Sequence, residues 1–138
     1  MLDLLKKKTK VILDTNFLFV PGELGVDIFS EIERLMNEPY EICVIQETVD
    51  ELQNLIVKYG KKKEGFNAKL GFIMIKQKGL KTLPSSTSEY ADDAILSWGR
   101  KNPKKTVVAT QDKELRKKLR DDSIRVIELK QKGYLTLR

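Results

Sequence analysis

The chain carries near its start the stretch Lys10-Val11-Ile12-Leu13-Asp14-Thr15-Asn16. Its first four residues are too few for a helix and rich in β-branched side chains, so they predict a buried strand. Asp14 follows that strand directly. In a parallel sheet, functional groups gather where the strands end, near the point at which the strand order reverses. Asp14 is therefore a candidate site residue.

Similar apolar runs recur along the chain and alternate with helical patterns. The predicted strands cover residues 10–13, 42–45, 80–83, 106–110 and 124–129. The predicted helices cover residues 27–37, 47–59, 65–78 and 113–120, with a further one that Ser88 and Glu89 open and Asn102-Pro103 ends. Asp27 is a plausible N-cap, and Gly60 a fitting helix stop. Continuous apolar strands alternating with helices predict a parallel sheet covered on both faces.

The length of 138 residues suits a single domain, with its core at about 10–129. The one cysteine, Cys43, lies in the apolar run 42–45, where a buried small residue is expected. A chain without a disulfide framework fits a reducing compartment. No apolar run approaches the roughly 18 residues of a membrane span, and no signal-length stretch follows Lys6-Lys7-Lys8. We expect a cytoplasmic protein without a membrane partner.

Charge and composition narrow the chemistry. The net charge is +6, from 26 Lys and Arg against 20 Asp and Glu, which favours polyanionic partners. The alternative is that the lysines serve solubility and thermal stability. The chain contains no histidine, which excludes histidine-dependent triads and zinc hydrolases. Hydrolysis would have to rely on carboxylates and hard metal ions.

Four short acidic signatures supply such carboxylates. They centre on Asp14, on Glu51 in Val49-Asp50-Glu51-Leu52, on Asp92-Asp93 in the run 90–96, and on Asp112 in the run 107–112. Carboxylates brought together from distant positions form a site for a hard divalent cation. Such sites commonly cleave phosphodiesters.

Each signature also has a structural alternative. Asp14 could accept hydrogen bonds from turn amides. Glu51 could be an exposed helix residue, with Asp50 competing for its role. Asp92-Asp93 would suit the first turn of a helix through the helix dipole, and Asp112 could be an N-cap. The order and placement of the four together favour a common site.

That order resembles the PIN-domain ribonucleases from about Lys10 to Leu129. The resemblance is greatest to the branch of ribosome-biogenesis endonucleases that act on small-subunit rRNA precursors. It rests on Glu51-Leu52 followed by a Lys/Tyr stretch, on Tyr90-Ala91-Asp92-Asp93, and on the run 109–115. The resemblance implies a three-layer α/β/α PIN-like fold with a central, mostly parallel sheet of about five strands. Toxin-type PIN ribonucleases share the four acids, but this chain resembles them less in the segments between those acids.

The resemblance also implies roles for individual residues. Catalytic residues and ligands of Mg²⁺ or Mn²⁺ would be Asp14, Glu51, Asp93 and Asp112. Asp93 is preferred to Asp92 because Asp-Ala-Ile matches the family's spacing, and Asp92 stays open as an additional ligand. Asn16 and Thr110 match polar positions that support the site.

Basic clusters next to the acids are candidates for RNA binding, through phosphate contacts that read no sequence. They comprise Lys58, Lys61, Lys62 and Lys63 after Glu51, and Lys113, Arg116 and Lys117 after Asp112. The alternative for each cluster is an exposed helix face. Two roles stay open for Tyr59 and Phe66: stacking on an RNA base, or contacts within a core or a dimer.

Together these features predict a metal-dependent endoribonuclease that cleaves RNA phosphodiesters, with a role in rRNA processing. The expected substrate is an rRNA precursor or structured RNA, and a homodimer and a ribosome-assembly partner are further expectations. Two alternatives stay open, a catalytically weak PIN-type RNA-binding module in ribosome assembly and a toxin-type PIN ribonuclease. A haloacid-dehalogenase-type phosphatase is disfavoured because Asn16 stands where it needs a second aspartate.

Overall fold

The structure is a computed structural model that describes residues 7–84, 90–130 and 133–138. Its strands are β1 Thr9–Leu13, β2 Tyr40–Ile45, β3 Lys81–Leu83, β4 Thr106–Ala109, β5 Arg125–Lys130 and β6 Tyr134–Leu137. Its α-helices are α2 Val20–Leu24, α3 Ile28–Leu35, α4 Gln46–Tyr59, α5 Lys63–Gln77, α6 Ala91–Lys101 and α7 Lys113–Asp121. Two 3₁₀ turns are η1 Thr15–Phe19 and η2 Pro103–Lys105.

The sheet has the strand order β3-β2-β1-β4-β5-β6. Neighbouring strands from β3 to β5 are parallel, and β6 pairs antiparallel with β5. The chain builds outward from β1 through β2 to β3, and then outward on the other side from β4 to β6. The strand order therefore reverses between β1 and β4, where Leu13 pairs with Ala109. The residues after these two strands, Asp14 and Thr110, lie side by side at that point.

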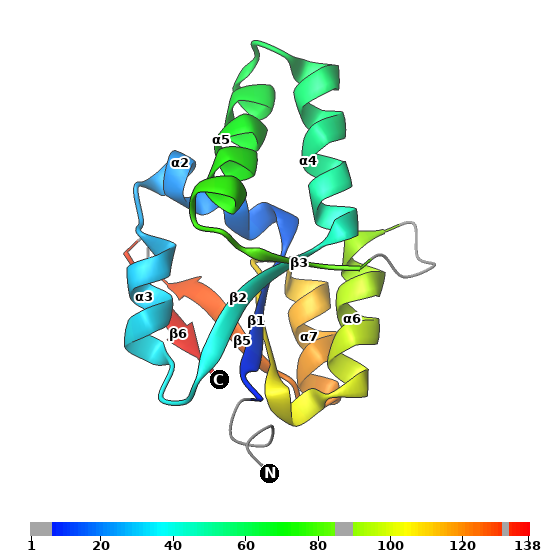
Figure 1. The fold of residues 1–138 in the computed structure, drawn as a ribbon. Helices are drawn as coiled ribbons and strands as arrows, with labels where there is room; N and C mark the ends of the chain where they lie inside the picture. The colour runs from blue at the N-terminus through cyan, green and yellow to red at the C-terminus, as the bar shows by residue number, and fades with distance from the viewer. Residues whose placement is uncertain (1–6, 85–89, 131–132) are drawn as a thin grey trace.

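Helices cover both faces of the sheet, as Figure 1 shows. Val11 and Leu13 of β1 pack with residues of α3 and α5 in one buried cluster. Ile12, between them, faces the opposite way and packs with residues of α6 and α7 in a second cluster. Side chains of a strand alternate between its two faces, so a continuous apolar run serves both clusters. The predicted three-layer α/β/α architecture is confirmed.

Individual residues determine where several helices begin and end. The carboxylate of Asp27 accepts hydrogen bonds from the amides of Phe29 and Ser30, both at 3.2 Å, and so caps α3 as predicted. Gly60 ends α4 with a positive φ of 50°, also as predicted. Gly65 lies against this turn, because a Cβ there would approach the carbonyl oxygen of Gly60 to 2.3 Å. This close contact lets α4 and α5 form the hairpin that projects from the body (Figure 1).

The sheet has one strand more than the five predicted. The predicted last strand, 124–129, is β5, and β6 follows it at the edge of the sheet. β6 is only four residues long, with Leu135 buried and Tyr134 46% exposed, so its alternating pattern is too brief to predict a strand by itself. The short helix α2 was not predicted either. Ser88 and Glu89, the predicted start of α6, lie outside the described residues.

Two expectations from composition bear on the fold. Cys43 is buried and unpaired with another cysteine, and burial raises the pKa of its thiol to about 11, which suits a packing role.

Within the described ranges, no helix has the length and apolar character needed to cross a bilayer.

Candidate active site

A cleft of about 640 Å³ opens beyond the carboxyl ends of β1 and β4, the two strands between which the strand order reverses. Six carboxylate residues line it: Asp14, Glu47, Asp50, Glu51, Asp92 and Asp112. Polar or aromatic residues complete much of the wall: Thr15, Asn16, Asn54, Phe19 and Tyr90. None of the described lining residues is lysine or arginine. The cleft is therefore strongly acidic on a protein of positive net charge.

Asp14 is the most buried of the acids predicted for the site, with 6% of its surface exposed. Its Oδ1 accepts a hydrogen bond from the amide of Thr15 at 2.8 Å, and its Oδ2 accepts one from the hydroxyl of Thr110 at 2.7 Å. The pKa of Asp14 is raised to about 6, mainly by burial; the two hydrogen bonds lower it, and the charges of Glu51 and Asp112 add to the rise. A cation bound in the cleft would stabilise the ionised form of Asp14.

Asp112 is both a helix cap and a cleft residue. Its Oδ1 accepts a hydrogen bond from the amide of Leu115 at 3.0 Å, so it caps α7. Its own amide donates to the hydroxyl of Thr110 at 3.0 Å. Thr110 thus ties Asp112 and Asp14 together. The capping alternative for Asp112 is true and is compatible with a place in the site.

Asn16 holds the loop that carries Asp112. Its Oδ1 accepts a hydrogen bond from the amide of Gln111 at 3.3 Å. The side chain of Gln111 accepts another from the amide of Leu129 at 2.8 Å, which anchors the loop to β5. Asn16 and Thr110 therefore form hydrogen bonds around Asp14 and Asp112, and their supporting role in a site stays a prediction.

Helix α4 contributes three acids to the lining of the cleft, Glu47, Asp50 and Glu51. The hydroxyl of Thr15 donates to Glu51 Oε1 at 3.1 Å, so η1 orients this glutamate. Glu47 lies one turn earlier on the same helix and is 7% exposed. Sequence reasoning missed Glu47 and Asn54, although both share a helix face with Glu51 at spacings of four and three residues. Asp50, the predicted competitor of Glu51, also lines the cleft.

The structure separates the two adjacent aspartates of α6. Asp92 lines the cleft, whereas Asp93 is not among its lining residues. Consecutive helix residues point about 100° apart, so only one of the pair can face the same wall. This placement differs from the preference for Asp93 drawn from the family resemblance. Which aspartate binds an ion stays a prediction.

The donor atoms suit a hard divalent cation, because all are carboxylate, amide or hydroxyl oxygens. In the described part of the chain, however, no three acidic residues are gathered closely enough to form a ready ligand set. Asp14 and Asp112 are held by hydrogen bonds, while Glu51 and Asp92 are exposed on helix surfaces. Exposed side chains change rotamer readily, so the latter two can adjust to an ion.

The predicted RNA-binding lysines fall in two places. Lys58, Lys61, Lys62 and Lys63 are exposed at the tip of the α4–α5 hairpin, beginning about 10 Å along the helix from Glu51. Lys113 and Lys117 are exposed on α7, next to Asp112. These positions leave both sets available to a polyanion. Their contact with RNA stays a prediction.

Arg116 differs from its basic neighbours. Its Nη1 donates to the carbonyl oxygen of Gln111 at 2.9 Å, and its Nε lies 3.0 Å from Glu128 Oε2. Both side chains are largely buried, 15% and 8% exposed. Arg116 is therefore engaged within the fold, between the loop of the site and β5, which does not favour the RNA contact predicted for it.

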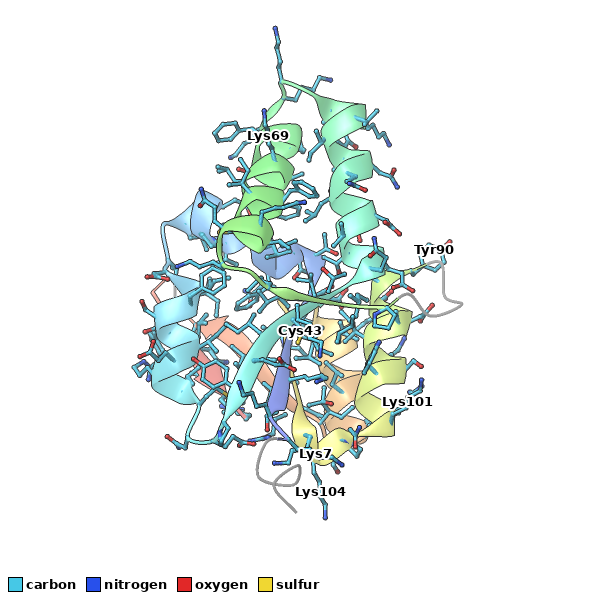
Figure 2. The ribbon with its side chains drawn as sticks, viewed as in Figure 1. Lys7, Cys43, Lys69, Tyr90, Lys101 and Lys104 are labelled. Carbon is cyan, nitrogen blue, oxygen red and sulfur yellow. The ribbon has the colours of Figure 1, made fainter. Side chains whose placement is uncertain are left out.

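The aromatic residues divide similarly. Tyr59 is half-buried with Lys58 Nζ 5.3 Å from its ring centre, and Phe66 is 59% exposed on α5. Neither lines the cleft. Tyr90 does, with 64% of its surface exposed, and Figure 2 shows it projecting outward near the start of α6. It is better placed than Tyr59 or Phe66 to stack on a base near the acids.

The fold and the acidic cleft define a member of a known family. Residues 11–132 match the family described as PIN like domain, and the chain belongs to that family. The resemblance drawn from the four acidic signatures is thereby confirmed at the level of the family.

Three known proteins are similar to the chain. Ribonuclease VapC4 of Methanocaldococcus jannaschii is 36% identical over 131 residues, which cover 93% of this chain and 95% of that protein. The structure of the PIN domain endonuclease Utp24 has a TM-score of 0.79 and 22% identity, covering 97% of this chain and 94% of that one. A domain of a functionally unknown protein from Methanocaldococcus jannaschii has a TM-score of 0.55 and 16% identity, covering 88% and 91%. The two solved structures support the fold alone.

Proposed function

We propose that the chain is a metal-dependent endoribonuclease that hydrolyses RNA phosphodiesters in the acidic cleft. The observation that carries this proposal is the buried Asp14, whose pKa is raised to about 6 by burial and by the neighbouring charges of Glu51 and Asp112. Such a group favours a cation at neutral pH. The similarity to Ribonuclease VapC4 supports RNA as the substrate.

Asp14, Glu51, Asp112 and one or both of Asp92 and Asp93 would hold Mg²⁺ or Mn²⁺. When bound, the ion would supply charge stabilisation for the scissile phosphate and lower the pKa of a nearby water. The protein residues supply position. Thr110 fixes Asp14 and Asp112 relative to each other.

The remaining groups of the cleft have supporting roles in this proposal. Thr15 orients Glu51 through its hydroxyl, and Asn16 holds the loop that carries Asp112. Tyr90 would stack on a base beside the scissile bond. The exposed lysines of α7 and of the hairpin tip would contact phosphates on either side of the cleft.

The biological role is a second part of the proposal. The sequence similarity to Ribonuclease VapC4 extends over nearly all of both chains and favours the toxin-type branch over rRNA processing. The structural similarity to Utp24, at 22% identity, carries the fold and does not decide between the branches. We therefore propose a toxin-type ribonuclease, with rRNA processing and a ribosome-assembly partner as the competing role.

Expression in a heterologous host tests this part. A toxin-type ribonuclease should arrest growth, and an Asp14→Asn variant expressed at the same level should not. Cleavage confined to a small-subunit rRNA precursor, without growth arrest, would favour rRNA processing. The mass of the purified protein in solution tests the expected homodimer.

The chemistry is tested with purified protein and single-stranded RNA. We expect cleavage with Mg²⁺ or Mn²⁺, none with EDTA, and recovery when the metal is restored. Asp14→Asn should lose cleavage, and Lys69→Gln, a substitution of an exposed residue on α5, should keep it. Cleavage by Asp14→Asn at the wild-type rate would rule out this site.

A second candidate is a PIN-type module that binds RNA without cutting it. The observation in its favour is that the described acids do not form a ready ligand set. This candidate predicts metal-independent RNA binding by the wild type with no product in any divalent metal. The same assay therefore separates the two candidates.

A further inference from the structure

A second cavity, of about 370 Å³, opens at the other end of the parallel strands, where β1 and β4 begin. Its wall includes Lys7, Lys8, Lys10, Lys105, Glu41 and Trp98. The first three lie at the start of β1, Lys105 directly precedes β4, and Trp98 lies near the end of α6. Figure 2 shows Lys7, Lys101 and Lys104 at the lower end of the molecule, away from the α4–α5 hairpin. We call this the basic cavity.

The basic cavity is distinct from the acidic cleft. Lys8 and Asp14 stand at the two ends of β1, six residues apart, which is about 20 Å in a strand. No residue of the described ranges lines both. The two hollows therefore lie at opposite ends of the parallel strands and carry opposite charge.

The charge of the basic cavity is only partly compensated. Lys10 pairs with Glu41 at 2.9 Å, so these two charges offset each other. Lys7, Lys8 and Lys105 are exposed; the charge of Lys8 acts on Glu41, which already pairs with Lys10, and that of Lys105 acts on Glu38, which already pairs with Arg125. The described lining residues include four lysines and one glutamate, so they carry an excess of three positive charges. An anion of more than one charge is the matching ligand.

Trp98 adds an aromatic surface to this charge. It is the one tryptophan of the chain, and it is half-buried, packing against the core cluster of α6 and α7 while it lines the cavity. Lys101 Nζ lies 5.9 Å from the centre of the Trp98 ring. Aromatic rings beside lysines are a common arrangement for single-stranded nucleic acid, in which bases stack and phosphates contact the cations.

We propose that the basic cavity is a second RNA-binding site, in which phosphates contact Lys7, Lys8 and Lys105 and a base stacks on Trp98. The choice of RNA among polyanions rests on the proposed function. A cavity of about 370 Å³ is larger than a single phosphate needs and suits a nucleotide unit. The site would hold a part of the RNA remote from the bond that is cut.

The single tryptophan makes this site directly observable. The Asp14→Asn variant, in EDTA, is titrated with a single-stranded RNA oligonucleotide while tryptophan fluorescence is recorded. We expect saturable quenching, because Trp98 is the only tryptophan. Lys8→Glu with Lys105→Glu should weaken the RNA affinity roughly tenfold or more and flatten its salt dependence.

Matched controls separate the basic cavity from general charge. Lys69→Glu with Lys76→Glu makes the same change of charge on exposed positions of α5 and should leave the quenching curve in place. Equal weakening by both pairs, or RNA binding without quenching, would overturn the proposal. Equal quenching by inorganic phosphate at the same concentration would also overturn it, because the site would then hold only a small anion.

Failure of this proposal can be distinguished from failure of the proposed function. Cleavage of a short RNA by the wild type with Mn²⁺ reports on the acidic cleft alone. Cleavage without quenching would reject the basic cavity and keep the ribonuclease. Quenching without cleavage would keep the basic cavity and reject the ribonuclease.

Discussion

The hydroxyl of Thr110 donates a hydrogen bond of 2.7 Å to Oδ2 of Asp14, joining residues that are 96 positions apart in the chain. The parallel pairing of β1 with β4 brings them together, since Leu13 and Ala109 are partners in register. The same hydroxyl accepts the amide of Asp112 at 3.0 Å. One buried side chain therefore positions two of the proposed ligands.

Replacing Thr110 tests this relationship. Thr110→Val keeps the shape but removes the donor to Asp14 and the acceptor for Asp112. We expect a loss of about 1.5–3 kcal/mol in the free energy of unfolding, because a buried charge loses a partner. The Thr110 bond lowers the pKa of Asp14, so its loss should move the acidic limb of the cleavage pH profile to higher pH. Thr110→Ser should restore both, and an unchanged pH profile in Thr110→Val would contradict a positioning role.

Asp14 itself should be a source of instability in the metal-free protein. Its pKa is raised from 3.8 to about 6, mainly by burial, so folding with this group ionised costs up to about 3 kcal/mol. The penalty is absent below pH 3.8, grows as the pH rises, and is complete above about 6. Asp14→Asn should therefore stabilise the metal-free protein at neutral pH by about 1–2 kcal/mol, since part of the hydrogen bonding is lost.

Urea unfolding in EDTA measures this effect. The advantage of Asp14→Asn should vanish as the pH falls below 3.8. Mg²⁺ or Mn²⁺ should stabilise the wild type and not the variant, because a ligand stabilises only the state that binds it. Asp50→Asn, an exposed acid of the same cleft, serves as the control and should change little. A less stable Asp14→Asn at neutral pH would contradict the raised pKa.

The adjacent aspartates of α6 give a third prediction. Asp92 lines the cleft and Asp93 does not, so Asp92→Asn should reduce cleavage by about a hundredfold or more, as expected for a lost metal ligand. Asp93→Asn should have an effect of less than about tenfold, through the electrostatics of the helix start. Cleavage rates of the two variants at saturating Mn²⁺ decide between them. The reverse order of effects would support the spacing argument that favoured Asp93.

The parts of the fold that were predictable share a physical origin. The apolar runs 11–13 of β1, 43–45 of β2 and 107–109 of β4 are buried, as expected for strands covered on both faces. β6 is a short edge strand that pairs with β5. Its own four residues do not specify that partner. Helix ends were predictable where a side chain or glycine does the capping, as at Asp27 and Gly60.

The position of the candidate cleft residues was predictable in part for the same reason. Asp14 directly follows β1, and Asp112 comes three residues after the end of β4, so the pairing of these two strands brings both acids to the cleft. Asp92 and Asp93 differ only in their angle about the helix, which depends on how α6 packs rather than on composition. Glu47 was missed because an acid in the first turn of a helix has an ordinary explanation in the helix dipole.

A surface ion pair yields a prediction about acid stability. Arg125 contacts Glu38 with both terminal nitrogens, at 2.6 Å and 3.2 Å. This contact, followed by a hydrogen bond from Thr9, lowers the pKa of Glu38 from 4.5 to about 2. A lowered carboxyl pKa stabilises the fold above pH 4.5, and this contribution is lost as the pH falls toward 2.

Glu38→Gln should therefore destabilise the protein at neutral pH and not at the acid end. Both side chains are about one-third exposed, so we expect a modest loss of about 0.5–1 kcal/mol. Glu33→Gln, an exposed residue of α3, provides the matched control. Urea unfolding across the acid range should show the gap between Glu38→Gln and wild type closing with falling pH. A gap of constant size would assign the effect to something other than the charge.

Arg116 and Lys117, neighbours on α7, should separate stability from RNA binding. Arg116 lies between the carbonyl oxygen of Gln111 and the buried Glu128, whereas Lys117 is exposed. Glu128 also contacts Arg120 and Lys130, at 3.2 Å each, so Arg116→Ala leaves it partly paired. We expect a loss of about 1–3 kcal/mol in stability from Arg116→Ala, because a buried carboxylate loses one of its partners.

Lys117→Ala should do the opposite, because an exposed lysine contributes little to folding but can contact a phosphate. We expect unchanged urea unfolding, together with a weaker RNA affinity and a salt dependence reduced by about one phosphate contact. RNA binding by Arg116→Ala, measured where the variant is folded, should keep the wild-type salt dependence. If Arg116→Ala lowered that dependence without loss of stability, the arginine would be an RNA ligand after all, and its contact with Glu128 would have to open when RNA binds.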